Sequence, residues 1–244
     1  PLMELVTEPD IHDAETAVKF AKELQMIMRY LGVSDANMEK GQMRVEVNLS
    51  IAPVGAKELG TKVEVKNINS FKAVEGAILY EVNRHKEVLE AGKEIVQETR
   101  GWDDIKRVTV SQRSKENAHD YRYFPEPDLP PFETASFGLE ELKNSMPELP
   151  RDRRIRFKKE YGLSDTQADA LVEDRAAGDF YESAASELKL REQDDKEDAV
   201  GVSEAKRLLF NYLTTDLRSL MSAGGTGFEA LKITPENFAE LIDL

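Results

Sequence analysis

Two alternating stretches of the sequence carry charged and polar side chains of the kinds that phosphoryl-transfer chemistry uses. In residues 43–51 the polar positions are Arg44, Glu46, Asn48 and Ser50, and in residues 62–66 they are Lys62, Glu64 and Lys66. Alternate residues of a strand point to one face, so each set is expected to share a face. Carboxylates suit a hard cation such as Mg²⁺, while Lys, Arg and amide groups suit phosphate oxygens. A solvated strand face explains the same pattern, and both interpretations stay open.

Two shorter features extend this set. Glu4 lies within the apolar run 2–6, which predicts a short strand, and a carboxylate there is costly to bury unless it is paired or metal-bound. An outward-facing strand residue is an equally good explanation. Asn67, Asn69 and Ser70 come at the start of a predicted helix, where free backbone amides attract anions. Simple capping of that helix by Ser70 is the alternative.

Two regions have the composition of RNA contacts. Residues 119–124 mix aromatic and cationic side chains, which could stack on bases and pair with phosphates, or pack on the core as an ordinary loop. A predicted helix over 151–161 carries six cationic residues: Arg151, Arg153, Arg154, Arg156, Lys158 and Lys159. In a chain with a formal net charge of −14 this cluster is a candidate contact for an RNA backbone. A soluble helix face is the alternative interpretation.

The composition argues against several classes of protein. The 244 residues allow one or two domains, and the excess of 47 acidic over 33 basic residues argues against a general nucleic-acid coating protein. The chain has no cysteine, so disulfides and thiolate zinc sites are excluded. No apolar run approaches the roughly 18 residues that span a bilayer. We therefore expect a cytoplasmic protein without a membrane partner, and the start at Pro1 suggests a fragment of a longer chain.

The elements that must position these side chains fall into two regions. Up to residue 145 we expect long helices after Asp13 and Ser70, an antiparallel pair of strands at 43–51 and 62–66, and further strands at 94–100 and 106–112 around a turn at 101–104. Beyond residue 145 the pattern is helical, with helices expected at 151–161, 165–175, 178–190, 203–222 and 235–244. The expected fold class is α+β: a mostly antiparallel sheet with flanking helices, followed by an all-helical region.

Longer motifs carry a resemblance to a known family. They lie at 1–11, 30–35, 60–71 and 97–103, and the most specific is RSKE at 113–116 followed by HDYRYFPEPDLPP at 119–131. With these motifs the chain resembles the B subunit of the tRNA-dependent amidotransferase, which is the GatB component of GatCAB. The resemblance covers essentially the whole chain, more weakly after residue 150.

The resemblance implies a ligase activity in protein biosynthesis. In this family ATP phosphorylates the side-chain carboxylate of misacylated Glu-tRNA(Gln) or Asp-tRNA(Asn), and ammonia that the partner A subunit releases from glutamine displaces the phosphate. An acyl phosphate has a good leaving group, whereas a carboxylate is a poor acceptor for ammonia. The implied partners are the A and C subunits of the amidotransferase and the misacylated tRNA, and the implied cofactors are ATP and Mg²⁺.

The resemblance also implies roles for single residues. Glu4, Glu46 and Glu64 would bind Mg²⁺, with Glu46 and Glu64 as catalytic groups. The expected ATP cradle consists of Arg44, Lys66, Asn67, Asn69 and Ser70. Glu46 stands where the family usually has Asp, so its longer side chain keeps the charge but moves it.

The resemblance divides the chain into three parts: the carboxy-terminal part of a kinase cradle domain (1–145), a helical domain (146–233) and the start of a tRNA-binding tail domain (234–244). The family's amino-terminal half, with zinc-binding cysteines and several metal-site residues, is expected to be missing, so we do not expect this chain alone to be a competent enzyme. The competing interpretation is a non-catalytic tRNA-binding scaffold. In the enzyme, Glu4, Glu46 and Glu64 should come within reach of one metal ion, whereas in the scaffold they should point to separate patches of solvent.

Overall fold

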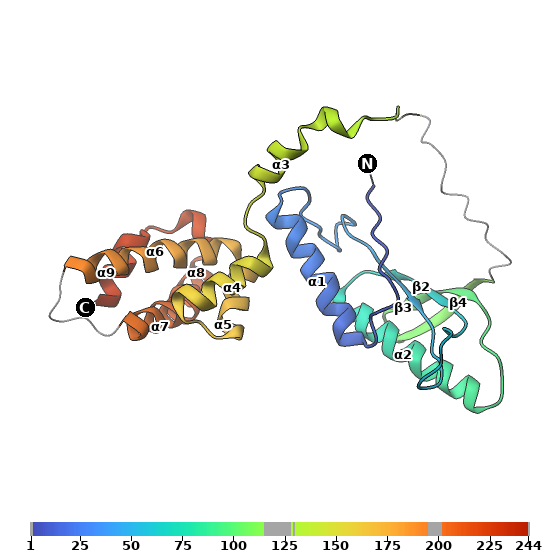
Figure 1. The fold of residues 1–244 in the computed structure, drawn as a ribbon. Helices are drawn as coiled ribbons and strands as arrows, with labels where there is room; N and C mark the ends of the chain where they lie inside the picture. The colour runs from blue at the N-terminus through green and yellow to red at the C-terminus, as the bar shows by residue number, and fades with distance from the viewer. Residues whose placement is uncertain (1, 115–127, 129, 195–201, 244) are drawn as a thin grey trace. The chain divides into compact units, whose positions relative to one another are not determined.

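The computed structural model describes residues 2–114, 128, 130–194 and 202–243. The chain forms two compact units that divide between Met146 and Pro147, here called the sheet unit and the helical unit (Figure 1). The aromatic and basic motif at 119–124 and most of the proline-rich segment 125–131 lie outside the described residues.

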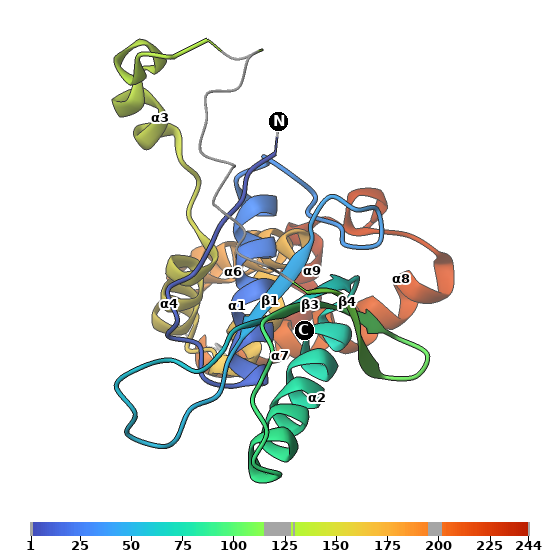
Figure 2. The same ribbon diagram turned by 90° about the vertical axis from the view of Figure 1, so that its right-hand side faces the viewer.

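The sheet unit consists of a four-stranded sheet and its helices. Its elements are α1 (Ala14–Tyr30), β1 (Val45–Leu49), β2 (Val63–Ile68), α2 (Phe71–Glu90), β3 (Glu98–Asp103), β4 (Val108–Ser114), a 3₁₀ turn (Thr134–Phe137) and α3 (Leu139–Ser145). The strand order is β1-β2-β3-β4, and the connection between β1 and β2 projects as a long loop (Figure 2). The β1–β2 and β3–β4 pairs are antiparallel, whereas β2 and β3 are parallel and joined by α2. The expected α+β class is therefore confirmed, with a mixed sheet.

Alternating apolar residues bury one face of this sheet. Val65 of β2 and Trp102 of β3 join Ala77 of α2 in a core cluster, and Val45, Val47 and Leu49 of β1 pack against it. Helices α1 and α2 contact each other and cover this face (Figure 1). Asp13 and Ser70 cap the two helices as expected, since each side chain accepts a backbone N–H of the first turn. The intervening polar residues of the strands are thereby directed to the other face of the sheet.

Two expectations about the sheet unit are wrong. The run 2–6 is not a strand, because a strand needs a hydrogen-bonded neighbour and no described strand pairs with this segment. The turn expected at 101–104 lies three residues later, at 104–107, because Trp102 is only 8% exposed and belongs to the core. Asp103 accepts hydrogen bonds from the backbone of Ile105 and Lys106, which fixes the turn there.

The helical unit has its own core of aromatic and apolar side chains. Its elements are α4 (Pro150–Tyr161), α5 (Asp165–Glu173), α6 (Arg175–Asp194), α7 (Val202–Tyr212), a π-helical turn (Leu213–Leu217), α8 (Arg218–Gly224), a 3₁₀ turn (Phe228–Ala230) and α9 (Pro235–Asp243). Phe157, Leu171, Tyr181 and Leu209 are fully buried, and the rings of Phe157 and Tyr181 lie 6.2 Å apart. In the part of the chain that is described, no helix is both long and apolar enough to cross a membrane.

Candidate functional site

Three of the expected site residues meet on the face of the sheet opposite α2. Lys66 Nζ lies 3.2 Å from Glu46 Oε2 and 3.5 Å from Glu64 Oε1. β1 supplies Glu46 and β2 supplies the other two, because the antiparallel pairing brings these positions together. Thr99 of β3 donates a 2.8 Å hydrogen bond from Oγ1 to Glu64 Oε2. We call Glu46, Glu64 and Lys66 the Lys66 cluster.

The charges of the Lys66 cluster hold its lysine in the protonated form. Partial burial acts to lower the pKa of Lys66, but the hydrogen bond and charge of Glu46, together with those of Glu64, raise it overall. The side chain of Glu64 is only 12% exposed, whereas that of Glu46 is 44% exposed. Two carboxylates against one ammonium leave the cluster with a net negative charge.

The expected gathering of three glutamates is not found. Among the described residues, no three or more His, Cys, Asp or Glu side chains lie close enough to hold a metal ion. Glu4 is exposed on an extended segment outside the sheet, because the expected strand 2–6 does not form. The cation between Glu46 and Glu64 is instead the ammonium of Lys66.

The other residues of the expected ATP cradle flank the Lys66 cluster along the chain. Arg44 is exposed just before β1, and Asn69 is exposed just before α2. Ser70 Oγ accepts a 3.1 Å hydrogen bond from Ala73 N, which is the capping role that was its alternative explanation. Asn67 does not belong to the start of α2, where it was expected: it lies in β2 and has a positive φ of 62°.

Residues that the sequence interpretation missed lie on the same face of the sheet. Thr99 and Gly101 come from β3, and Gln112 comes from β4. Of these, only Gly101 could have been noticed in the sequence, since a glycine inside a strand often marks a place where another group approaches the backbone closely. Gln112 is the extra residue of a β-bulge, because Thr99 pairs with Arg113 whereas Arg100 pairs with Ser111.

A buried polar network on the covered face was also missed. Glu81 of α2 is fully buried, and it contacts Arg84 Nη2 at 2.7 Å, Arg100 Nε at 3.1 Å and His85 Nε2 at 3.2 Å. Thr109 of β4 donates a short hydrogen bond to the same carboxylate. Burial acts to raise the pKa of Glu81, but the contacts from His85, Arg84 and Thr109 outweigh it and lower the pKa to about 2. The network fixes α2 against β3 and β4.

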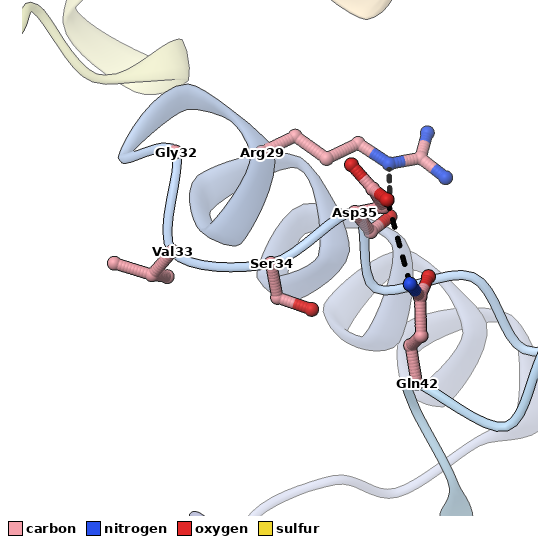
Figure 3. Close-up of a pocket in the computed structure, with 6 residues that line it drawn as sticks. All are labelled: Arg29, Gly32, Val33, Ser34, Asp35 and Gln42. Carbon is pink, nitrogen blue, oxygen red and sulfur yellow. Dashed lines mark hydrogen bonds between the residues drawn. The ribbon is translucent and has the colours of Figure 1, made fainter.

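A pocket of about 380 Å³ lies at the carboxyl end of α1, and none of the expected site residues lines it (Figure 3). Arg29 Nε donates a 2.7 Å hydrogen bond to the Asp35 carbonyl, and Gln42 Nε2 lies 3.4 Å from Asp35 Oδ2 (Figure 3). Its polar groups therefore hold the loop between α1 and β1.

The expected RNA contacts on α4 need a correction. Arg153 is only 4% exposed and pairs with Asp179 at 2.6 Å. Three other cations of the helix are also paired within the helical unit: Arg154 with Asp169, Arg156 with Glu148 and Glu182, and Lys158 with Asp165. Their charges are neutralised locally, because acidic residues of the neighbouring helices and of the segment before α4 face this helix. Arg151 and Lys159 are exposed and remain candidate contacts for a phosphate backbone.

Comparison with known proteins identifies the family. The model of the GatB/GatE catalytic domain matches residues 1–138. Three similar relatives are each named as the B subunit of an aspartyl/glutamyl-tRNA(Asn/Gln) amidotransferase. They come from Rippkaea orientalis (43% identical over 244 residues, 46% of the relative), Dehalococcoides mccartyi strain CBDB1 (48% over 247 residues, 49% of the relative) and Carboxydothermus hydrogenoformans (43% over 244 residues, 48% of the relative).

All of this chain is covered in each of the three alignments, and the chain spans about half the length of these curated relatives. The match of the family model includes all four strands and the whole Lys66 cluster. The chain therefore belongs to the GatB/GatE catalytic domain family.

Proposed function

We propose that this chain is part of the B subunit of a tRNA-dependent amidotransferase and contributes one wall of its carboxylate-activating site. In this proposal ATP phosphorylates the side-chain carboxylate of Glu-tRNA(Gln) or Asp-tRNA(Asn). Ammonia from glutamine, supplied by a partner protein of the complex, then attacks the acyl phosphate and releases inorganic phosphate. The A and C subunits of the amidotransferase would be the partners.

The observation that carries this proposal is the Lys66 cluster, which lies on the sheet face opposite α2 and within the residues that the family model matches. Glu46 and Glu64 keep Lys66 protonated and hold its ammonium on that face. An ammonium fixed in this way can donate to a phosphoryl oxygen, whose charge grows during transfer. Lys66 is therefore assigned the role of phosphate ligand, and Glu46 and Glu64 orient it.

Magnesium enters the proposal only as the ion that accompanies the phosphates of ATP. The described residues gather no set of three carboxylates, and Lys66 itself lies between Glu46 and Glu64. These residues do not form a metal site by themselves, so no step is assigned to a metal ion held by this chain.

The test uses the full-length protein assembled with its partners in the complex. Lys66→Met should lower the rate of tRNA-dependent ATP hydrolysis and of amidation by about 10²- to 10³-fold, the usual effect of removing a charge-stabilising donor. Glu64→Gln should lower both rates in parallel. Lys93→Met is the matched control, since Lys93 is exposed and follows α2, and its rates should stay within about twofold of the wild type. Wild-type rates in a folded Lys66→Met complex would refute the assignment.

The scaffold alternative uses the aromatic and basic motif at 119–124, which lies outside the described residues, and the basic helix. In that helix four of the six cations are ion-paired within the helical unit. On that helix, Arg151 and Lys159 are exposed and remain candidate contacts for RNA.

A further inference from the structure

Two β-bulges flank β3 beside the Lys66 cluster. Val45 pairs with Ile68 and Val47 pairs with Val65, so β2 has one residue more than β1 in this interval, and Asn67 lies in it. In β4 the extra residue is Gln112. Bulges redirect side chains and are frequent beside active sites. Here they bring two carboxamides together from strands on opposite sides of β3.

Gly101 of β3 provides the space in which these carboxamides lie. A Cβ atom placed on Gly101 would lie 2.1 Å from Gln112 Nε2 and 3.1 Å from Asn67 Nδ2. Any other residue at this position would force the Gln112 amide away, because contacts below 3 Å are not tolerated, and would crowd the Asn67 amide. Glycine thus lets both amides rest on the strand backbone, and Lys66 is its register partner on β2.

Both carboxamides are available to a ligand. Asn67 and Gln112 are exposed, and neither side chain makes a hydrogen bond to any described residue. Carboxamides carry no net charge, and the phosphoryl group is already assigned to the ammonium of Lys66, so we expect an uncharged part of the ligand to lie against these amides. A neutral planar group with donors and acceptors along one edge fits this surface better.

We propose that Asn67 and Gln112 bind the N6/N7 edge of an adenine over Gly101. A carboxamide offers an acceptor and a donor side by side, which matches the N6 amino group and the N7 atom of adenine. This inference rests on the proposed function, in which two ligands carry adenine: ATP and the 3′-terminal adenosine of the aminoacyl-tRNA. Asn67 and Gln112 recognise the base in this proposal, whereas Lys66 binds phosphate.

Equilibrium binding to the full-length complex tests the proposal without depending on amidation. In one arm the dissociation constant of ATP is compared with those of 7-deaza-ATP, which lacks N7, and of purine riboside triphosphate, which lacks the N6 amino group. In the other arm tRNA ending in adenosine is compared with tRNA ending in the same two analogues. One arm should show weakening of roughly 5- to 100-fold, the range for a lost bidentate base contact, and that arm identifies the ligand.

The variants separate base recognition from folding. Asn67→Gly keeps the positive φ without the amide, and Gln112→Met keeps the length of the side chain. The double variant should bind the natural ligand and its analogues equally, and Gly101→Ala should reduce the discrimination by displacing the Gln112 amide. Gln97→Met, at an exposed glutamine just before β3, should retain the full discrimination. Absence of discrimination in the wild type in both arms, or its persistence in the folded double variant, would overturn the proposal.

Discussion

Asn67 combines an unusual backbone conformation with a position at the candidate site. Its φ of 62° lies in the left-handed region, which Asn tolerates better than most residues and Gly tolerates best. We predict that Asn67→Ala lowers the free energy of unfolding by about 1 kcal/mol, while Asn67→Gly changes it by only a few tenths. Urea unfolding followed by the fluorescence of Trp102, the one tryptophan of the chain, measures both. If Asn67→Ala and Asn67→Gly lower the free energy of unfolding equally, the effect does not come from the backbone conformation.

Glu81 predicts an acid-dependent term in the stability of the sheet unit. Its pKa is about 2 in the folded chain against an ordinary value of 4.5. Because the pKa is lower in the folded chain, the ionised carboxylate stabilises the folded state. This stabilisation is complete above pH 4.5 and is lost as the pH falls toward 2. The contribution is on the order of 3 kcal/mol.

The measurement compares wild type and Glu81→Gln by Trp102 fluorescence in urea at several pH values. At pH 7 the variant should be less stable by a few kcal/mol, because Arg84 and Arg100 lose their buried counter-charge. The two stabilities should converge between pH 4.5 and 2.5, since the wild-type carboxylate approaches protonation there. Parallel pH profiles would show that Glu81 does not titrate with folding.

At the scale of the element, α4 is a helix whose cations hold the helical unit together. Arg153 lies against the Phe157 ring, with its guanidinium carbon 4.9 Å from the ring centre, and pairs with Asp179 of α6. We predict that Arg153→Met destabilises the helical unit by about 2–3 kcal/mol, whereas Arg151→Met costs less than about 0.5 kcal/mol. Hydrogen exchange of the α6 amides reports the difference.

For tRNA binding we expect the opposite order: Arg151→Met should have the larger effect and Arg153→Met the smaller one. Arg151→Met should weaken binding and reduce its salt dependence, because an exposed cation releases counterions when it meets a phosphate. Arg153→Met should leave the salt dependence unchanged. A larger effect of Arg153→Met on salt dependence would reinstate the buried arginine as an RNA contact.

Element boundaries that depend on local signals were predictable from the sequence. The caps at Asp13 and Ser70 mark where α1 and α2 begin, because a capping side chain acts on amides only two or three residues away. The alternation in β1 and β2 likewise identified the pair that positions Lys66, since the period of two is a property of each strand alone.

Features that depend on long-range pairing were not predictable. The parallel pairing of β2 with β3 and the two bulges depend on how strands that are distant in the sequence align with each other. Gln112 therefore had no signal as a site residue, and the charges of α4 looked solvent-exposed because their partners Asp169 and Asp179 lie on other helices. The segment around Glu4 looked like a strand because an apolar run does not reveal whether it has a neighbour.

At the scale of the whole molecule, the two units have separate cores. Ile78 of α2 is buried in the cluster around Trp102, while Leu171 of α5 is fully buried in the helical unit. The family model covers residues 1–138, so the Lys66 cluster belongs to a unit whose stability comes from its own sheet and helices. Substitutions in one core should then leave the other unit unchanged.

We predict this independence for a pair of cavity-forming variants. Ile78→Ala should lower the stability reported by Trp102 fluorescence by roughly 2–5 kcal/mol and leave hydrogen exchange of the α6 amides unchanged. Leu171→Ala should have the opposite pattern, because Leu171 is fully buried in the helical unit. If either variant shifts both probes by similar amounts, the units unfold as one cooperative body, and changes in α4 could then alter the Lys66 cluster without touching it.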